Sequence, residues 1–520
     1  MSDFLASAGV LAAAAGAAGA ILLPAGRLRA VAMLAALALF PALILGDQWH
    51  SHQIADLRDH PTRLIALGAL ALVASLALAF LFRRWPILLP LAIVAALPFR
   101  IPLHAGGDTA NLLVPLYLVI AGGVLATGWR DWCATPALLP GPAGPTAWMP
   151  RVLAAVVLLY AIQVLYSEDF SKGLQSVCFF FVPFSLVYGL LRDVSWDRKL
   201  LALVVWVVAF EAVAFVVVGS VEWVSRSLFW NDQVIRSNEF HTYFRVNSVF
   251  WDPNVYGRYL ALVAVVAMSA LLWARERRTF GLLTALVAVV WFGLFPTFSQ
   301  SSFAALLAGL AVLAALRWSL KWTAVAVAAS VVLVALIMTV AGSFSFDRIN
   351  IDTSGRANLV SGGIHLFAQR PVYGYGSGSF PKAYRQHVRT RKAPVSVSHT
   401  EPVTVAAEQG LVGLVLYVAL VVTALWTMAS RAGGVAGGTT PEDALATGRG
   451  GGFPAATGPA RQVVVARAAV LATFIALLVH TMAYAGFFED PITWVLLAAG
   501  VSLAAAQQHR VEPCPDTSVA

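Results

Sequence analysis

The sequence predicts an all-α polytopic membrane protein, with about 12–15 transmembrane helices and one large, partly helical loop outside the bilayer. Hydrophobic residues make up 59% of the chain and charged residues only 12%, against about 25% charged residues in soluble domains. Apolar runs of about 17–22 residues, the length that a bilayer span requires, recur along the whole chain. The ten-residue alternating segments that are typical of membrane β-barrels do not occur in the sequence.

The apolar runs define the expected spans and the organisation of the chain. We expect spans at roughly 8–25, 28–46, 62–82, 85–103, 111–127, 150–166, 174–190, 199–219, 255–273, 280–297, 300–316, 320–341, 409–428, 464–486 and 490–507. The predicted regions are N-terminal helices at 1–219, a loop at 220–254, central helices at 255–342, a large loop at 343–408, C-terminal helices at 409–507 with a flexible linker at 429–463, and a tail at 508–520.

The distribution of basic residues predicts the orientation. If the spans alternate, the basic residues of the short loops all fall on one side, which the positive-inside rule assigns to the cytoplasm. The loops at 220–254 and 343–408 then face the opposite side. The basic residues assigned to the cytoplasmic side are Arg27, Arg29, Arg83, Arg84, Arg192, Arg198, Lys199, Arg275, Arg277, Arg278, Arg317, Lys321 and those from Arg431 to Arg461.

Charge and cysteine usage exclude several classes of function. The net charge of +9 arises partly from these cytoplasmic basic residues, so nucleic-acid binding is not indicated. The three cysteines, Cys133, Cys178 and Cys514, lack disulfide or metal-site spacing. The outer loops contain no His-x-x-x-His pattern and no carboxylate cluster. We therefore expect no metal and no cofactor.

The large loop is strongly basic and has a predicted helix of its own. A concentration of cationic side chains beside a bilayer suits a phosphate-bearing lipid or an anionic glycan. Residues 353–355 can cap a helix at about 356–369, whose apolar stripe could rest on the membrane surface, and Pro371 ends it. The basic residues are Arg348, Arg356, Arg370, Lys382, Arg385, Arg389, Arg391 and Lys392, against two acidic residues, Asp347 and Asp352.

Two arginines near the loop at 220–254 are candidate phosphate ligands. Arg245 is expected a few residues above the bilayer, where its guanidinium could fork two phosphate oxygens; the alternative is an arginine that snorkels to lipid headgroups. Arg258 is expected one turn into the following span, with Asp252 or a ligand phosphate as its partner. Asn254, in the Asp-Pro-Asn turn before that span, is a secondary candidate.

His399, at the end of the large loop, is the candidate proton acceptor. Glu401 and Glu408 lie close enough in sequence to orient its imidazole. The alternative is an ordinary polar anchor at the membrane interface. Secondary candidates for binding an anionic substrate are Lys382, Arg385, Arg389 and Arg391.

Four motifs in a fixed order carry a resemblance to a known family. They are Arg245-x-x-Ser-x-Phe-x-Asp-Pro-Asn254, Thr297-Phe-Ser-Gln-Ser-Ser302, Gly355-Arg356 with Pro371-x-x-Gly-x-Gly-x-Gly-x-Phe380, and His399-Thr-Glu with Ala407-Glu-Gln-Gly-Leu-Val-Gly413. Over roughly 245–417 the chain resembles the O-antigen ligase and O-antigen polymerase family of the bacterial inner membrane. One position departs from the family pattern: Gln300 stands where members often carry arginine.

The resemblance implies a metal-independent glycosyltransferase with its active site facing the periplasm. Members take a glycan from undecaprenyl pyrophosphate; the ligase passes it to a sugar hydroxyl of lipid A-core, and the polymerase to another repeat unit. The resemblance further implies that His399 is the base and that Arg356 and Arg245 hold the pyrophosphate. A single base without a carboxylate nucleophile fits one-step, inverting displacement.

Within this family the sequence favours the ligase. The phosphates of lipid A-core would match the surplus basic residues Arg385, Arg389, Arg391 and Lys392, which a polymerase does not need. A polymerase and a protein O-oligosaccharyltransferase of the same family remain alternatives. A lipid-linked oligosaccharide flippase is the alternative from another class, but it would need charged residues along a path through the membrane, and most spans lack them.

Overall fold

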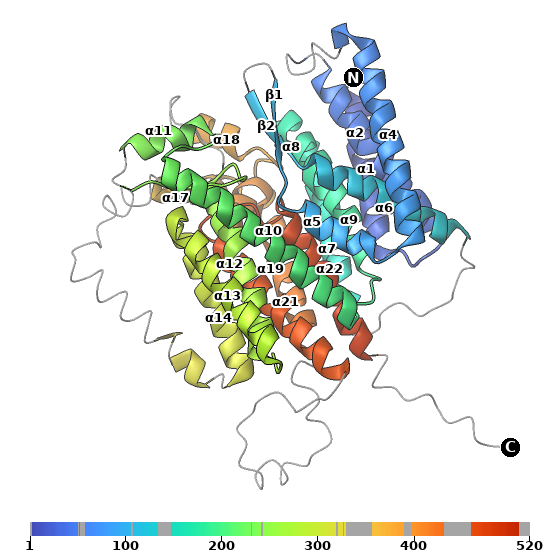
Figure 1. The fold of residues 1–520 in the computed structure, drawn as a ribbon. Coiled ribbons are helices and arrows are strands. Elements are labelled where there is room, and N and C mark those ends of the chain that lie inside the picture. Colours follow the sequence, from blue (N-terminus) through green and yellow to red (C-terminus); the bar gives the residue numbers. More distant parts are fainter. Residues whose placement is uncertain are drawn as a thin grey trace, which may run out of the picture.

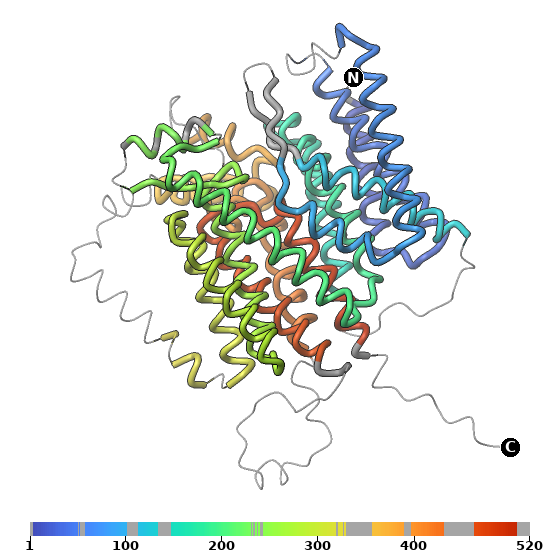
Figure 2. Tube along the Cα trace, viewed as in Figure 1, coloured from blue at the N-terminus to red at the C-terminus, as the bar shows by residue number. Residues whose placement is uncertain are grey.

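Long helices run between two opposite ends of the molecule (Figure 1), and the short helices α8, α11, α17 and α18 gather at one of them. We call this the outer end and the opposite one the inner end. Helix α1 begins at the outer end and α22 finishes at the inner end, as Figure 2 shows. The computed structural model describes residues 3–49, 51, 58–105, 108–133, 147–229, 231–240, 243–318, 321–325, 327–328, 356–388, 397–430 and 459–508.

The helical fold class is confirmed. Among the described residues, 10 helices are long and apolar enough to cross a membrane. The helices of the first half are α1 (Asp3–Leu22), α2 (Arg27–Gln48), α4 (Pro61–Arg84), α5 (Leu88–Ala96), α6 (Val114–Cys133), α7 (Trp148–Val164), α8 (Phe170–Ser176), η3 (Val177–Phe181), α9 (Val182–Leu191) and α10 (Arg198–Ser225). Those of the second half are α11 (Asp232–Phe240), α12 (Pro253–Leu272), α13 (Arg277–Leu294), η4 (Phe295–Thr297), α14 (Gln300–Arg317), α17 (Arg356–Gln369), α18 (Phe380–His387), α19 (Glu401–Ala429), α21 (Pro459–Thr481) and α22 (Pro491–Gln508).

One expected span is not a continuous helix. In place of a span at 85–103, α5 covers nine residues, Leu88–Ala96. An antiparallel hairpin of β1 (Ile101–Ala105) and β2 (Asp108–Leu112) follows it. Pro98 and Pro102 explain the break, because each disfavours helical geometry in the residue before it. Most of the span expected at 320–341 lies outside the described residues.

Side-chain caps fix where several helices begin. Asp197 accepts a hydrogen bond from the Leu200 N–H (2.8 Å) at the start of α10. Asp252 accepts one from Asn254 (2.6 Å) at the start of α12, and Ser299 caps α14. A short acceptor at this position satisfies one of the free N–H groups of the first turn.

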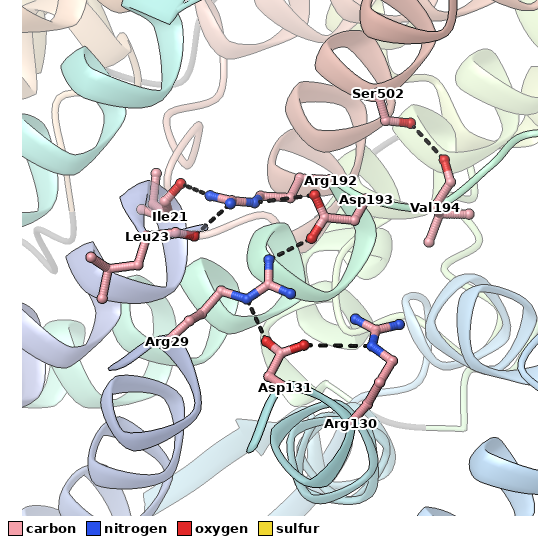
Figure 3. Close-up of polar contacts among 9 residues, drawn as sticks. All are labelled: Ile21, Leu23, Arg29, Arg130, Asp131, Arg192, Asp193, Val194 and Ser502. Atoms are coloured by element: carbon pink, nitrogen blue, oxygen red, sulfur yellow. Dashed lines mark hydrogen bonds and ion pairs between the residues drawn. The ribbon is translucent and has the colours of Figure 1, made fainter. Parts of the chain in front are cut away.

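A buried ion-pair network ties helices together at the inner end (Figure 3). Arg29 of α2 is fully buried and pairs with Asp131 of α6 (Nε–Oδ2 2.6 Å) and with Asp193, just after α9. Arg192 donates to the carbonyl of Leu23 (2.6 Å) after α1. Ser502 of α22 donates to the carbonyl of Val194 (3.0 Å). Basic residues of separate connections therefore meet at one end, as the predicted alternation of spans requires.

The helix expected at about 356–369 is confirmed as α17, but its expected place on the membrane surface is wrong. Leu366 of α17 is fully buried in a small core with Phe380 and Tyr384 of α18 and Ala407 of α19. A Cβ at Gly363 would lie 2.5 Å from the Val403 side chain, so glycine permits this close approach. The apolar stripe thus holds α17 against the outer part of α19. The expected cap at 353–355 lies outside the described residues.

Helix α19 begins eight residues before the expected start at 409 and contains a kink. Gly410 has φ 66° and ψ −163°, a conformation that favours glycine. The backbone freed by the kink pairs with the glycine-rich turn after α17. Leu411 N–H donates to the Pro371 carbonyl (2.7 Å), and Gly376 N–H donates to the Glu408 carbonyl (2.8 Å). The kink therefore joins the end of the large loop to the span that follows it.

Candidate active site

His399 lies at the outer end, in the turn just before α19. Its φ is 64°, the left-handed region that histidine adopts more readily than most residues. Ser398 stabilises the turn: its hydroxyl donates to the Thr400 carbonyl (2.8 Å) and accepts from the Thr400 N–H (3.2 Å). The centroid of the His399 ring lies 6.2 Å from that of Tyr484.

The surroundings of His399 keep its imidazole neutral. Burial lowers the pKa of this half-buried ring below its ordinary value of 6.5, and the charge of Arg356 lowers it further. The Asp252 carboxylate opposes these effects. Because the net direction is downward, the ring is unprotonated at neutral pH and can accept a proton.

Arg245 is held firmly beside the start of α12. Its Nε donates to the Thr297 carbonyl (2.9 Å) and its Nη2 to Asn254 Oδ1 (3.2 Å). The Asn238 side chain bonds both the N–H and the carbonyl of Arg245 (3.0 Å each). The sharp turn at Phe298, with φ 48°, brings the Thr297 carbonyl to Arg245. Asn254, a secondary candidate from the sequence, is therefore a positioning residue for this guanidinium.

Arg356 approaches from the first turn of α17. Its Nη1 donates to the carbonyl of Ala483 (3.1 Å), in the connection between α21 and α22. The positive charge of Arg356 lowers the pKa of both His399 and Arg245. The structure thus brings together three residues at positions 245, 356 and 399 on separate elements. We call Arg245, Arg356, His399 and Asp252 the polar cluster.

Arg258 does not join this cluster through the partner expected from the sequence. Its Nη2 pairs with Asp490 Oδ2 at 2.7 Å, and both side chains are almost fully buried. The Asp252 carboxylate instead caps α12 by accepting from the Asn254 N–H. Arg258 therefore fastens α12 to the residue just before α22, and its charge is neutralised there.

The expectation that Glu401 or Glu408 orients the His399 ring is also corrected. The Glu401 carboxylate accepts from the Gly486 and Phe487 N–H groups (2.7 and 3.1 Å). The Glu408 carboxylate accepts from the Gly378 and Phe380 N–H groups (2.9 and 3.0 Å). Backbone donors in nearby connections compete effectively for a buried carboxylate. Both glutamates thus stabilise the connections around the site.

Of the four secondary basic candidates of the large loop, the structure describes Lys382 and Arg385, both on α18. Lys382 of α18 donates to the carbonyl of Glu168, and the Glu168 carboxylate pairs with Arg370 (3.1 Å) and His387 (3.4 Å). Arg385 is exposed on the same helix. The remaining two candidates, Arg389 and Arg391, lie outside the described residues. Among the residues that the structure describes, no group of three or more His, Cys, Asp or Glu side chains could hold a metal ion.

Three further residues line the site and were not among the sequence candidates. Tyr484 packs near His399, and His480 of α21 lies 5.8 Å from Tyr484, ring centroid to centroid. His480 Nε2 also contacts the Ser301 hydroxyl at 3.2 Å. Arg100, after α5, exerts its charge on Tyr484. No spacing in the sequence points to these residues, since Arg100 follows α5 whereas His480 and Tyr484 lie at and just after the end of α21, far from it in the chain.

Comparison with known proteins finds one similarity, over part of the chain. Residues 285–418, from within α13 to within α19, match the family model described as O-antigen ligase. The matched region includes the turn at Thr297, the start of α17 and His399, but not Arg245 or Tyr484. No curated protein sequence matches the chain. Members of this family are glycosyltransferase-like membrane enzymes that act on lipid-linked glycans and an acceptor. The part of the chain at residues 285–418 is therefore similar to the O-antigen ligase family.

Proposed function

We propose that this protein is an O-antigen ligase of the bacterial inner membrane. It transfers a polysaccharide from undecaprenyl pyrophosphate to a sugar hydroxyl of lipid A-core, with the outer end facing the periplasm. The observation that carries the proposal is the meeting of His399 with Arg245 and Arg356. One group that can accept a proton and two that can bind phosphate lie together at the end of the molecule opposite the inner arginine network.

His399 acts as the general base in this proposal. As the acceptor hydroxyl attacks the anomeric carbon, a new carbon–oxygen bond forms and the bond to the pyrophosphate oxygen breaks. The hydroxyl proton passes to the imidazole, whose lowered pKa keeps it unprotonated at neutral pH. The ring need not be held by a carboxylate, because the Ser398 turn and the Tyr484 ring fix its position.

Arg245 and Arg356 bind the departing pyrophosphate. The leaving group gains negative charge as the bond breaks, and fixed guanidiniums stabilise that charge without having to reorganise. Arg245 is preorganised by the Thr297 carbonyl and the Asn254 amide oxygen. Beyond those two bonds, its guanidinium has no hydrogen bond to a described residue, so donors remain for phosphate oxygens. In this scheme the two arginines make divalent metal unnecessary.

One reconstitution distinguishes the ligase from the polymerase and tests the mechanism. The purified protein is supplied with lipid-linked donor and, in separate reactions, with lipid A-core or with a second lipid-linked repeat unit. We expect glycan transfer to lipid A-core alone, with the opposite anomeric configuration in the product. Elongation of the lipid-linked repeat would favour the polymerase. Retained configuration would contradict single displacement by a hydroxyl activated at His399.

A further inference from the structure

The connection between α21 and α22, residues 482–490, forms one wall of the candidate site, beside the starts of α17 and α19. Four hydrogen bonds hold the connection to these two helix starts. The Met482 carbonyl accepts from the Thr400 hydroxyl (3.0 Å) and the Ala483 carbonyl from Arg356 (3.1 Å). The Gly486 and Phe487 N–H groups donate to the Glu401 carboxylate. The segment is thus fixed on both sides of Tyr484.

Tyr484 occupies the middle of this wall. Its ring centroid lies 6.2 Å from that of His399 and 5.8 Å from that of His480. The side chain is only partly buried, and its hydroxyl makes no hydrogen bond to any described residue. Ring contacts therefore fix the phenol while its hydroxyl stays available.

The charges around Tyr484 favour an anion in front of it. Three positive charges, those of Arg258, Arg100 and Arg356, act on the phenol, and one negative charge, that of Asp252, opposes them. Arg258 is already neutralised by Asp490. Arg100 and Arg356 make no ion pair with a described residue, and their charges act on the phenol against the single carboxylate of Asp252.

The phenol itself remains a hydrogen-bond donor. Burial raises the pKa of Tyr484 above its ordinary value, Asp252 raises it further, and the arginines only partly oppose this. A neutral phenol has one O–H to donate, and an anionic oxygen is the acceptor that binds such a donor most strongly.

We propose that Tyr484 is a further substrate-binding residue, which donates a hydrogen bond from its hydroxyl to a phosphate oxygen of the pyrophosphate held by Arg245 and Arg356. The inference rests on the proposed function and adds a ligand from a segment outside the matched region at 285–418. The bond strengthens as the leaving group gains charge, so Tyr484 contributes to turnover as well as to binding.

The test is Tyr484→Phe in the full-length protein, because phenylalanine keeps the ring contacts with both histidines and removes only the hydroxyl. Binding of inorganic pyrophosphate is measured by calorimetry, separately from glycan transfer. We expect binding about 10- to 150-fold weaker than wild type, the range for loss of a hydrogen bond to a charged group. We also expect a lower kcat with lipid-linked donor.

The matched control is Tyr373→Phe. Tyr373 is 59% exposed at the same end of the molecule, so its variant loses an identical hydroxyl outside the polar cluster. It should bind pyrophosphate like the wild type. Tyr484→Phe with wild-type pyrophosphate binding would overturn the assignment and leave Tyr484 as packing for His399. A wild-type protein that binds no pyrophosphate would also overturn it.

The two proposals fail separately in this design. If the wild type binds pyrophosphate and Tyr484→Phe does not, yet no glycan reaches lipid A-core, the hydrogen-bond assignment stands and the ligase proposal fails. If transfer to lipid A-core occurs and Tyr484→Phe matches the wild type in binding and kcat, the ligase proposal stands and the hydrogen-bond assignment fails.

Discussion

Replacing Arg245 by lysine keeps a positive charge at the site but removes the planar fork of donors. In the structure, Nε of Arg245 is committed to the Thr297 carbonyl at 2.9 Å and Nη2 contacts Asn254 Oδ1 at 3.2 Å. A lysine ammonium is a single point donor and cannot keep both contacts while also presenting paired N–H groups to a phosphate. Arg245→Lys therefore tests whether geometry, rather than charge alone, binds the pyrophosphate.

The expected size of the effect follows from the bonds that are lost. One charge-assisted hydrogen bond to phosphate contributes about 1.5–3 kcal/mol, so its loss lowers kcat/KM about 10- to 150-fold. The substitution also removes the hydrogen bond from Arg245 to the Thr297 carbonyl, so the segment at 243–254 is held less firmly against Thr297. Asn254→Ala removes only the Nη2 contact, so we expect a smaller loss than in Arg245→Lys.

The assay is initial-rate glycan transfer from lipid-linked donor to lipid A-core, normalised to folded protein in the membrane. The control is Arg236→Lys, since Arg236 is exposed on α11 at the outer end. It should retain wild-type kcat/KM. If Arg245→Lys also stays within about threefold of wild type, a difference of less than 1 kcal/mol, then the fork is irrelevant and only a diffuse electrostatic role remains.

Three other predictions concern stability, metal and orientation. Glu408→Gln should destabilise the protein by about 1.5–3 kcal/mol, because an amide group would face one of the two N–H donors at Gly378 and Phe380; an unchanged unfolding temperature would contradict that role. Transfer should continue in excess EDTA, and activity that chelator abolishes and magnesium restores would refute the arginine-based account. In a background without cysteine, Gln386→Cys on α18 should react with an impermeant thiol reagent once the outer membrane is opened, while Thr279→Cys on α13 should not; the reverse pattern would invert the topology.

The fold could be predicted largely from the sequence because span length and apolar character are local properties. Helix α17 was expected at about 356–369 and is found at Arg356–Gln369. The interruption after α5 was missed because average hydropathy outweighed two prolines. The place of α17 was missed as well, since an apolar stripe can face lipid or protein, and only tertiary packing brings Phe380 and Tyr384 against it.

The candidate site could be predicted only in part. Arg245, Arg356 and His399 were expected together from the resemblance, and the structure brings them together. The ion pair of Arg258 with Asp490 was not predictable, because 232 residues separate the partners and Asp252 lies closer in sequence. Glu401 and Glu408 were expected to orient His399 because they are close to it in the chain. Their carboxylates instead accept hydrogen bonds from backbone N–H groups that are distant in sequence.

The most direct test of the central claim is the turnover of His399→Gln, measured per correctly inserted molecule under saturating donor. Glutamine is similar in size and polarity but cannot accept a proton near neutral pH. We expect the variant to insert and to bind donor, yet to lose about 10²- to 10⁴-fold in turnover. In the wild type, kcat/KM should fall only below about pH 6.5, as the imidazole with its lowered pKa becomes protonated. A His399→Gln protein within about threefold of wild type, with the same pH profile, would show that His399 is an interfacial anchor and not the base.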